Sequence, residues 1–250
     1  MKKLFLSILC LLILSVVANA AGTEKYKYVV TYKWGLIQKD AGDVVITHVP
    51  KGDGYELKLT AKTKPWADKV YKVRDTLISV TSREKYRPIR FSHIAHEKNK
   101  YRHDEIKFSY SGNKVYGRSE KYKEDKNGKI TSSVHQLEGA IPTYDMLSVY
   151  FFLRDLDYSK MKAGETINAT IFSGSKSENL QVRCKGKETI KLRDNTEREA
   201  WHIVFKFTQH GGKKSSDDIS CWISTAAPHI PLQIVGSLPI GQIKVHYVGS

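Results

Sequence analysis

Cysteine is scarce in this sequence. Three cysteines occur in 250 residues, and Cys10 lies within an N-terminal apolar run, so only Cys184 and Cys221 remain beyond it. Two cysteines in an oxidising compartment permit one disulfide, and the sequence leaves open whether Cys184 and Cys221 form it. A chain of this length buries enough apolar surface to fold without that bond.

No segment after residue 17 is long and apolar enough to span a bilayer. Lys2 and Lys3 precede the uncharged residues 4–17, and Ala18-Asn19-Ala20 places small side chains where signal peptidase cleaves. The uncharged run is short for a helix that must cross about 30 Å of hydrocarbon. The sequence therefore predicts a signal peptide over residues 1–20, cut after Ala20, and a single all-β-type domain over residues 21–250 with no transmembrane helix.

Acidic side chains are outnumbered. The chain has 41 Lys and Arg against 26 Asp and Glu, a formal net charge of +15. In a cytosolic protein this balance would indicate nucleic acid as a partner, but export argues against it. Anionic envelope material, such as lipid headgroups, phosphates or acidic glycans, is the more plausible partner. The alternative is that the charges only solvate the outer faces of strands.

The sequence also lacks a convincing catalytic constellation. Residues 173–176 match an S-x-x-K pattern, but they fall in a predicted hairpin turn rather than at a helix start. Residues 112–119 approach a phosphate loop but carry arginine where lysine is needed. His93, His96 and His103 cluster without completing H-E-x-x-H, so satisfied surface histidines are the simpler interpretation. We therefore expect no enzymatic activity, no cofactor and no bound metal.

Alternation of polar and apolar residues dominates the rest of the chain. It is clearest over residues 25–34, where Tyr26, Tyr28, Val30, Tyr32 and Trp34 share one face. Similar segments recur every 8–12 residues or so and are separated by turn sequences. The pattern predicts a mostly β protein with one or more curved antiparallel sheets, as a half-barrel or a sandwich. The proline-containing residues 226–241 are expected along an edge or across an opening.

Two segments interrupt the alternation. Pro65 and the spacing of the apolar residues after it predict a short helix near residues 65–72. Residues 142–157 are apolar almost without a gap, which predicts one buried helix around residues 143–156, with Thr143 as its N-cap. A buried strand is the alternative, because paired aromatic and β-branched residues favour β structure.

Asp145 and Arg154 lie near the ends of this predicted helix. They are nine residues apart, so a helix would separate them by about 13–14 Å along its axis and they could not pair. We expect both to be structural anchors of the helix. Asp145 would accept hydrogen bonds from backbone N–H groups, and Arg154 would bind a strand carboxylate or carbonyl.

Three segments resemble one protein family. They are YVVTYKWGLIQKDAG (residues 28–42), YDMLSVYFFLRDLD (residues 144–157) and CWISTAAPHIPLQIVGSLPIGQIKVHY (residues 221–247). Their order and spacing resemble bacterial exported proteins catalogued as domain of unknown function 3108. The resemblance implies a periplasmic protein of the Gram-negative envelope and provides no catalytic residue. One departure is Thr225, where the family usually has an acidic residue.

A looser, fold-level similarity is to periplasmic lipoprotein carriers, in which a curved half-barrel closed by short helices holds acyl chains. By that analogy we expect a non-enzymatic envelope protein with an apolar groove for a lipid or other amphiphile, and a cavity of about 300 Å³ or more beside the buried helix. The groove would be lined by Tyr28, Tyr32, Trp34, Trp66, Tyr150, Phe151 and Trp222. Its basic rim would include Lys25, Lys27, Lys33, Arg118, Lys121 and Lys123.

The alternative is a structural or interaction protein of the envelope. Its interior would be filled, the aromatic residues would be core, and a basic surface would bind a partner protein or an anionic glycan. An enzyme is the third hypothesis, and it would require a nucleophile and a base within hydrogen-bond reach in a cleft.

Overall fold

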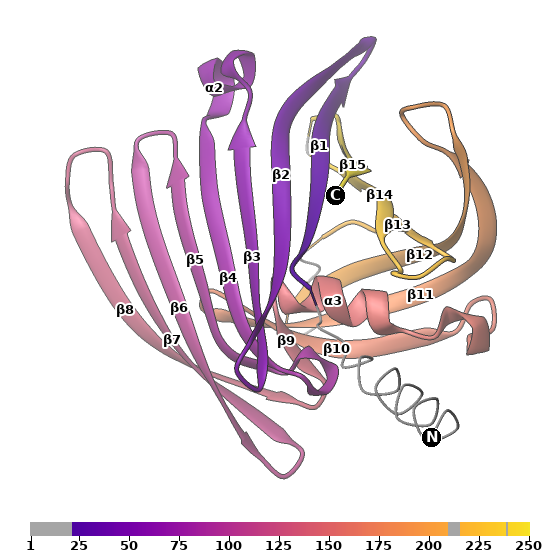
Figure 1. The fold of residues 1–250 in the computed structure, drawn as a ribbon. Coiled ribbons are helices and arrows are strands. Elements are labelled where there is room, and N and C mark those ends of the chain that lie inside the picture. The colour runs from indigo at the N-terminus through magenta and orange to yellow at the C-terminus, as the bar shows by residue number, and fades with distance from the viewer. Residues whose placement is uncertain (1–21, 210–215, 239) are drawn as a thin grey trace, which may run out of the picture.

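The computed structural model describes residues 22–209, 216–238 and 240–250 (Figure 1). Over these residues the strands form one 15-stranded sheet in the order β8-β7-β6-β5-β4-β3-β2-β1-β15-β14-β13-β12-β11-β10-β9. The expected mostly β fold is confirmed, as a single sheet that curls into a nearly closed, barrel-like shape. The predicted signal peptide lies outside the described residues.

The first eight strands form an antiparallel meander with two short helical segments. Each strand pairs with the next along the chain. In chain order the elements are β1 (Glu24–Trp34), β2 (Ile37–Lys51), β3 (Gly54–Thr63), α2 (Pro65–Tyr71), β4 (Val73–Ser82), η1 (Glu84–Tyr86), β5 (Pro88–Glu97), β6 (Lys100–Ser111), β7 (Lys114–Glu124) and β8 (Ile130–Ala140). Helix α2 confirms the short helix predicted near residues 65–72.

The second half of the chain returns to the first strand. It comprises β9 (Thr143–Asp145), α3 (Ser148–Asp155), η2 (Tyr158–Lys160), β10 (Thr166–Ser173), β11 (Lys176–Lys191), β12 (Glu197–Gln209), β13 (Ile219–Ser224), β14 (Pro231–Ser237) and β15 (Gln242–Gly249). Strand β15 pairs with β1 and joins the halves into one sheet. Strand β14 corrects the expectation of an edge segment, because it lies between β13 and β15 and begins at Pro231, where a strand tolerates proline.

The buried helix is shorter than the sequence predicts. Residues 143–145 form strand β9, which pairs in parallel with β10 through Tyr144 opposite Ile171, and helix α3 begins only at Ser148. Thr143 therefore does not cap the helix. The local sequence does not reveal this break, because the partner that makes residues 143–145 a strand lies about 25 residues further along the chain.

Helix α3 lies in the concavity of the curved sheet, between its two halves (Figure 1). Leu147 and Phe151 pack into one buried apolar cluster with side chains of β1 to β7. Leu153 packs into a second cluster with side chains of β10 to β13. The opposite faces of this short helix thus enter separate cores, which explains why nearly its whole circumference is apolar.

Phe172 of β10 closes the gap between the two ends of the sheet. Its ring is fully buried and stacks on Phe108, with ring centroids 5.4 Å apart. A Cβ atom built on Gly117 of β7 would come within 2.7 Å of that ring, and one on Gly139 of β8 within 3.2 Å. These glycines provide the space that the ring occupies, so β10 can pack directly across β7 and β8.

The two cysteines are free and buried. Cys184 of β11 and Cys221 of β13 lie opposite Ile203 of β12, on either side of it. Two strand spacings separate them by about 9–10 Å, whereas a disulfide requires Cα atoms about 4.4–6.8 Å apart. This spacing excludes the pairing that the sequence left open.

Free thiols lead to a simple prediction. After denaturation without reductant, Cys184 and Cys221 should both react with an alkylating reagent, and dithiothreitol should leave the melting temperature of the native protein unchanged. Peptide mass spectrometry gives the first result and thermal scans the second. A peptide linking Cys184 to Cys221 would contradict the strand register.

Candidate functional site

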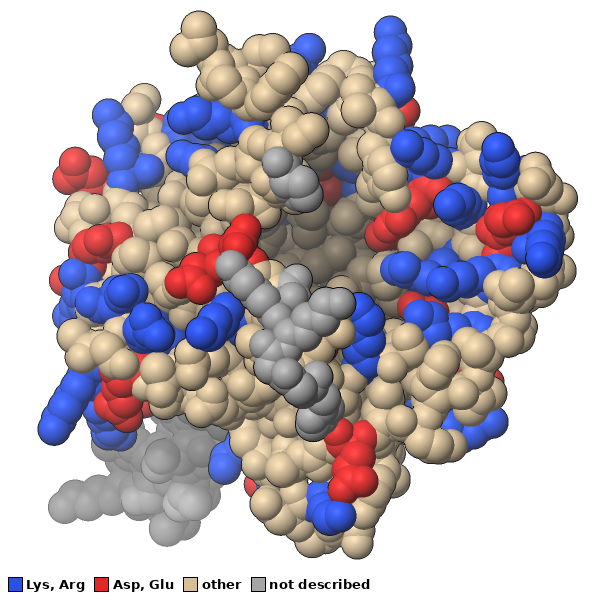
Figure 2. Space-filling view, turned by 180° about the vertical axis from the view of Figure 1, so that it is seen from behind, with Lys and Arg blue, Asp and Glu red and all other residues tan. Residues whose placement is uncertain are grey.

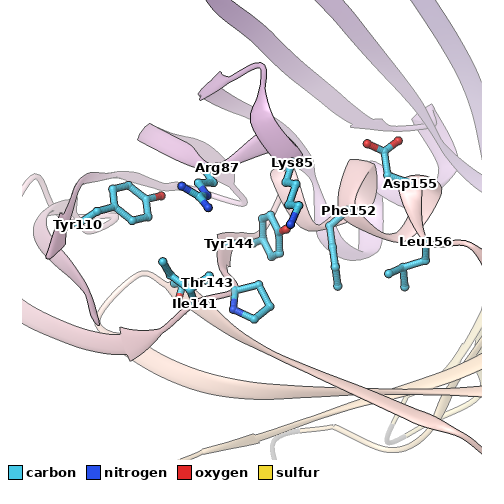
Figure 3. Close-up of a pocket in the computed structure, with 10 residues that line it drawn as sticks. Lys85, Arg87, Tyr110, Ile141, Thr143, Tyr144, Phe152, Asp155 and Leu156 are labelled. Carbon is cyan, nitrogen blue, oxygen red and sulfur yellow. The ribbon is translucent and has the colours of Figure 1, made fainter. Parts of the chain in front are cut away.

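A pocket of about 340 Å³ opens beside helix α3 (Figure 3). Four chain segments meet there: η1 with the residue after it, the end of β6, the region from β8 to β9, and the C-terminal half of α3 with the residue after it. The lining residues are Lys85, Arg87, Tyr110, Ile141, Pro142, Thr143, Tyr144, Phe152, Asp155 and Leu156. The volume meets the size expected of a small-molecule site.

Apolar side chains form most of the pocket wall. The rings of Tyr144 and Phe152 stack with centroids 4.6 Å apart, and Ile141, Pro142 and Leu156 extend the apolar surface. Burial raises the pKa of the Tyr144 phenol to about 12, so it stays protonated at neutral pH. The wall therefore suits an uncharged, apolar portion of a ligand.

Charged groups lie at the pocket margin. Lys85 and Arg87 come from one side and Asp155 from the other (Figure 3). Arg87 forms an ion pair of 3.2 Å with Glu84, while Lys85 is exposed. The Tyr110 hydroxyl donates to the Pro88 carbonyl at 2.7 Å. Apolar walls with basic groups at one edge match an amphiphile that carries a negative charge.

An unusual backbone conformation in η1 separates two neighbouring side chains. Lys85 and Tyr86 both have φ of 52°, in the left-handed region that residues other than glycine rarely adopt. The Tyr86 ring turns inward and packs 5.2 Å from those of Tyr55 and Phe151, whereas Lys85 lines the pocket. Such strained residues concentrate at functional sites, where the surrounding packing holds them in place.

Asp145 anchors the N-terminal end of α3. Its carboxylate accepts hydrogen bonds of 2.8 Å from the backbone N–H groups of Leu147 and Ser148, and one of 2.6 Å from the Ser79 hydroxyl of β4. The Ser148 hydroxyl accepts a hydrogen bond from the Asp145 backbone N–H. The carboxyl group is fully buried, and burial raises its pKa against the opposing effect of these hydrogen bonds.

Arg154 anchors the C-terminal end. Its guanidinium donates to the His229 carbonyl at 3.1 Å and to the carboxylate of Glu24, in β1, at 3.2 Å. It also lies over the ring of Tyr26, 5.0 Å from its centroid. Burial raises the pKa of Glu24, but hydrogen bonds from Tyr26 and Arg154 and the charge of Arg154 outweigh that effect and lower it. Both anchors make the types of contact expected from the sequence.

Only part of the expected aromatic groove is brought together. The hydroxyls of Tyr28 and Tyr150 are 2.7 Å apart, and Phe151 is buried beside Tyr150. These three residues fill the core on the other face of α3. They do not line the pocket.

The other four residues of that expected groove lie elsewhere. Tyr32 is half-buried and donates to the Ile240 carbonyl, and Trp34 is exposed at the end of β1. Trp66 donates to the Asp40 carbonyl from α2. Trp222 points away from the core that Cys221 and Ile223 enter, and it stacks on His202.

The expected basic rim does not form a single surface. Lys121 and Lys123 lie on one face of β7. Lys121 is close to Asp104 and to the β10–β11 turn, and burial there lowers its pKa. The side chain of Arg118 is exposed on the opposite face of β7 and forms an ion pair with Glu120. Figure 2 shows basic side chains scattered among acidic ones over the face seen from behind. Charge on that face is dispersed rather than gathered.

The clustered histidines also separate. His93 is buried between the Asp75 carboxylate at 3.2 Å and the Arg102 guanidinium at 3.0 Å. His103 contacts Ser92, and His96 packs on Tyr101. In the part of the chain that the structure describes, no group of three or more His, Cys, Asp or Glu residues is arranged to hold a metal ion.

The sequence analysis did not predict this lining. Lys85 and Tyr110 lie far along the chain from Tyr144 and Asp155, and no short motif joins the two pairs. The one local signal was the dense apolar segment, which indicated that something must cover α3. A Lys-Tyr dipeptide does not indicate that its lysine will adopt a positive φ, as Lys85 does.

Comparisons with known proteins agree with this architecture. A crystal structure of a β-barrel-like protein of domain of unknown function DUF1849 from Brucella abortus is similar in fold, with a TM-score of 0.57 and 10% identity, covering 90% of this chain and 95% of that chain. No curated protein matches the sequence. No helix in the described ranges has the length and hydrophobicity to span a bilayer. A family model described as protein of unknown function (DUF3108) matches residues 27–248, so the chain belongs to that family.

Proposed function

We propose that this protein is an exported, periplasmic envelope protein that binds an anionic amphiphile in the pocket beside α3. The observation that carries the proposal is the pocket itself, about 340 Å³ with mostly apolar walls and two basic residues at its margin. The apolar part of the ligand would lie against Tyr144, Phe152 and Leu156. Its charged group would lie near Lys85 and Arg87.

The construction of the pocket supports a binding role. Part of its wall belongs to α3 and β9, whose junction is held by the hydrogen bonds of buried Asp145. A wall fixed in this way loses little conformational freedom when a ligand binds. Binding without chemistry is the function we propose for this lining, which is mostly apolar and carries its charged groups at the margin.

Lys85 provides a direct test of ligand charge. We expect Lys85→Glu to weaken binding of dodecyl phosphate by about tenfold, because one attraction near the headgroup becomes a repulsion. The same variant should bind dodecyltrimethylammonium more tightly than the wild-type protein does. Isothermal titration calorimetry with each amphiphile measures both effects below the concentration at which it forms micelles.

Lys25→Glu is the matched control. Lys25 is an exposed residue of β1, and its substitution by glutamate changes the net charge of the protein by the same amount. Equal weakening by Lys25→Glu and Lys85→Glu would show that only overall charge matters, and no binding of either amphiphile by the wild-type protein would refute the pocket as their site.

A further inference from the structure

The turn between β1 and β2 carries an unusual set of exposed apolar side chains. Trp34 and Ile37 pair across the hairpin and are each 56% exposed, and Leu36 at its apex is fully exposed. The hairpin rises beyond the neighbouring strands at the upper end of the molecule in Figure 1. Large apolar residues gathered at one projecting turn mark a surface that something else covers.

Two neighbouring segments extend this surface. The turn between β14 and β15 exposes Leu238 and Ile240, and it is tied to β1 by the hydrogen bond from the Tyr32 hydroxyl to the Ile240 carbonyl. Helix α2, at the same end of the molecule, exposes Val70. The apolar residues at this end therefore come from three segments of the chain.

Basic residues surround the apolar turn. Residues 33–39 contain Lys33 and Lys39, both exposed, and no acidic residue. Asp40, the next residue, is already engaged, because Arg193 binds its carboxylate through two hydrogen bonds of 2.8 and 3.0 Å. Exposed Lys69 of α2, and exposed Lys72 directly after this helix, add positive charge at the same end. The surface is thus apolar at its apex and basic around it.

We propose that the β1–β2 turn docks the protein on an anionic lipid bilayer, with Trp34, Leu36 and Ile37 inserted at the interface and Lys33 and Lys39 at the level of the headgroups. Tryptophan favours the membrane interface, and lysines beside an anionic leaflet strengthen attachment. A protein partner is a poorer fit, because a stable protein interface buries roughly 1,000 Å² or more and a projecting turn of a few residues offers far less.

This docking surface is separate from the pocket. Strand β1 runs from Glu24, which binds Arg154 at the end of α3, to Trp34 at the turn. Its 11 residues span about 35 Å at the usual rise. Docking through the turn would therefore leave the α3 pocket far from the bilayer. The inference holds whether or not the pocket binds a ligand.

Vesicle co-sedimentation tests the inference. The protein is expressed from the 250-residue sequence, and its intact mass shows at which residue the purified chain begins. We expect it to bind vesicles of phosphatidylcholine and phosphatidylglycerol in equal parts, to bind phosphatidylcholine vesicles more weakly, and to dissociate as salt is raised. Ile37→Asp and Leu36→Asp should each weaken binding by about tenfold or more, because each removes an inserted apolar side chain.

The chain offers a closely matched control. Ile130 is 57% exposed and begins strand β8, just as Ile37 is 56% exposed and begins β2. Ile130→Asp should leave vesicle binding unchanged, and Lys33→Glu with Lys39→Glu should abolish the preference for anionic vesicles. Melting temperatures confirm that each variant is folded.

Three results would overturn the inference. The first is a wild-type protein that does not sediment with the anionic vesicles at low salt. The second is an Ile130→Asp variant that loses as much binding as Ile37→Asp. The third is a wild-type dimer that Ile37→Asp converts to monomer without any effect on vesicles. That result would assign the turn to contact between two copies of the chain.

Discussion

Asp145→Ala is expected to lower the melting temperature by roughly 6–12 °C. The aspartate accepts hydrogen bonds from Leu147, Ser148 and Ser79 in a fully buried position. Its removal leaves two backbone N–H groups and a hydroxyl without partners, at a cost of about 3 kcal/mol in the free energy of unfolding. In a domain of this size each kcal/mol corresponds to about 2–4 °C. Differential scanning calorimetry provides the measurement.

Asp145→Asn separates hydrogen bonding from charge. The amide oxygen can still accept from Leu147 and Ser148, so this variant should melt well above Asp145→Ala. Burial raises the folded-state pKa of Asp145 above its ordinary 3.8, so the stability that this group contributes is present below about pH 4 and is lost as pH rises through the raised pKa. Relative to Asp145→Asn, the wild-type protein should therefore lose stability as the pH rises from about 4 through that raised pKa.

The opposite trend with pH would mean that the hydrogen bonds to Asp145 outweigh its burial. An Asp145→Ala protein with an unchanged melting temperature would refute its anchoring role altogether.

Phe172→Ala should destabilise the fold by about 3–5 kcal/mol, the usual cost of removing a buried aromatic ring. The ring joins β10 to the far end of the sheet, where it stacks on Phe108 and fills the space above Gly117 and Gly139. Its loss leaves a cavity where the two ends of the sheet meet. Urea denaturation followed by circular dichroism measures the change.

A double-mutant cycle with Gly117 makes this test specific. Gly117→Ala alone should cost about 1–3 kcal/mol, because its new methyl group would meet the Phe172 ring at 2.7 Å. In the Phe172→Ala background that clash is gone, so Gly117→Ala should cost much less or even stabilise the protein. Additive effects would show that the two residues do not touch and that the sheet does not close as described.

The sequence predicted the fold well where the signal was local. Alternation over residues 25–34 predicted strand β1 correctly, with Tyr26 and Tyr28 buried. Alternation fails to predict burial where β1 and β2 shift register between Val30 and Thr31. The buried side chains of β1 are those of Tyr26 and Tyr28 before the shift and that of Thr31 after it. The side chains of Tyr32 and Trp34 therefore lie outside the core. A bulge of this kind depends on the partner strand, which alternation within one strand does not report.

The ends of α3 and the pocket needed tertiary information. Residues 143–145 are a strand because β10 pairs with them, although their own sequence is compatible with a helix start. Asp145 and Arg154 were recognisable because a charged residue inside an apolar segment must find a buried partner. The sequence predicted the size of the pocket and its position beside the helix, but it predicted the wrong face of the helix, because the lining residues come together only through the curvature of the sheet.

The measurement that tests the central claim most directly is native mass spectrometry of the protein purified from the cells that make it, followed by solvent extraction. The account predicts a population that carries an anionic amphiphile, released on extraction, and lower occupancy in Lys85→Glu than in Lys25→Glu. A wild-type protein that is entirely free of ligand, or equal occupancy in the two variants, would contradict binding in the α3 pocket.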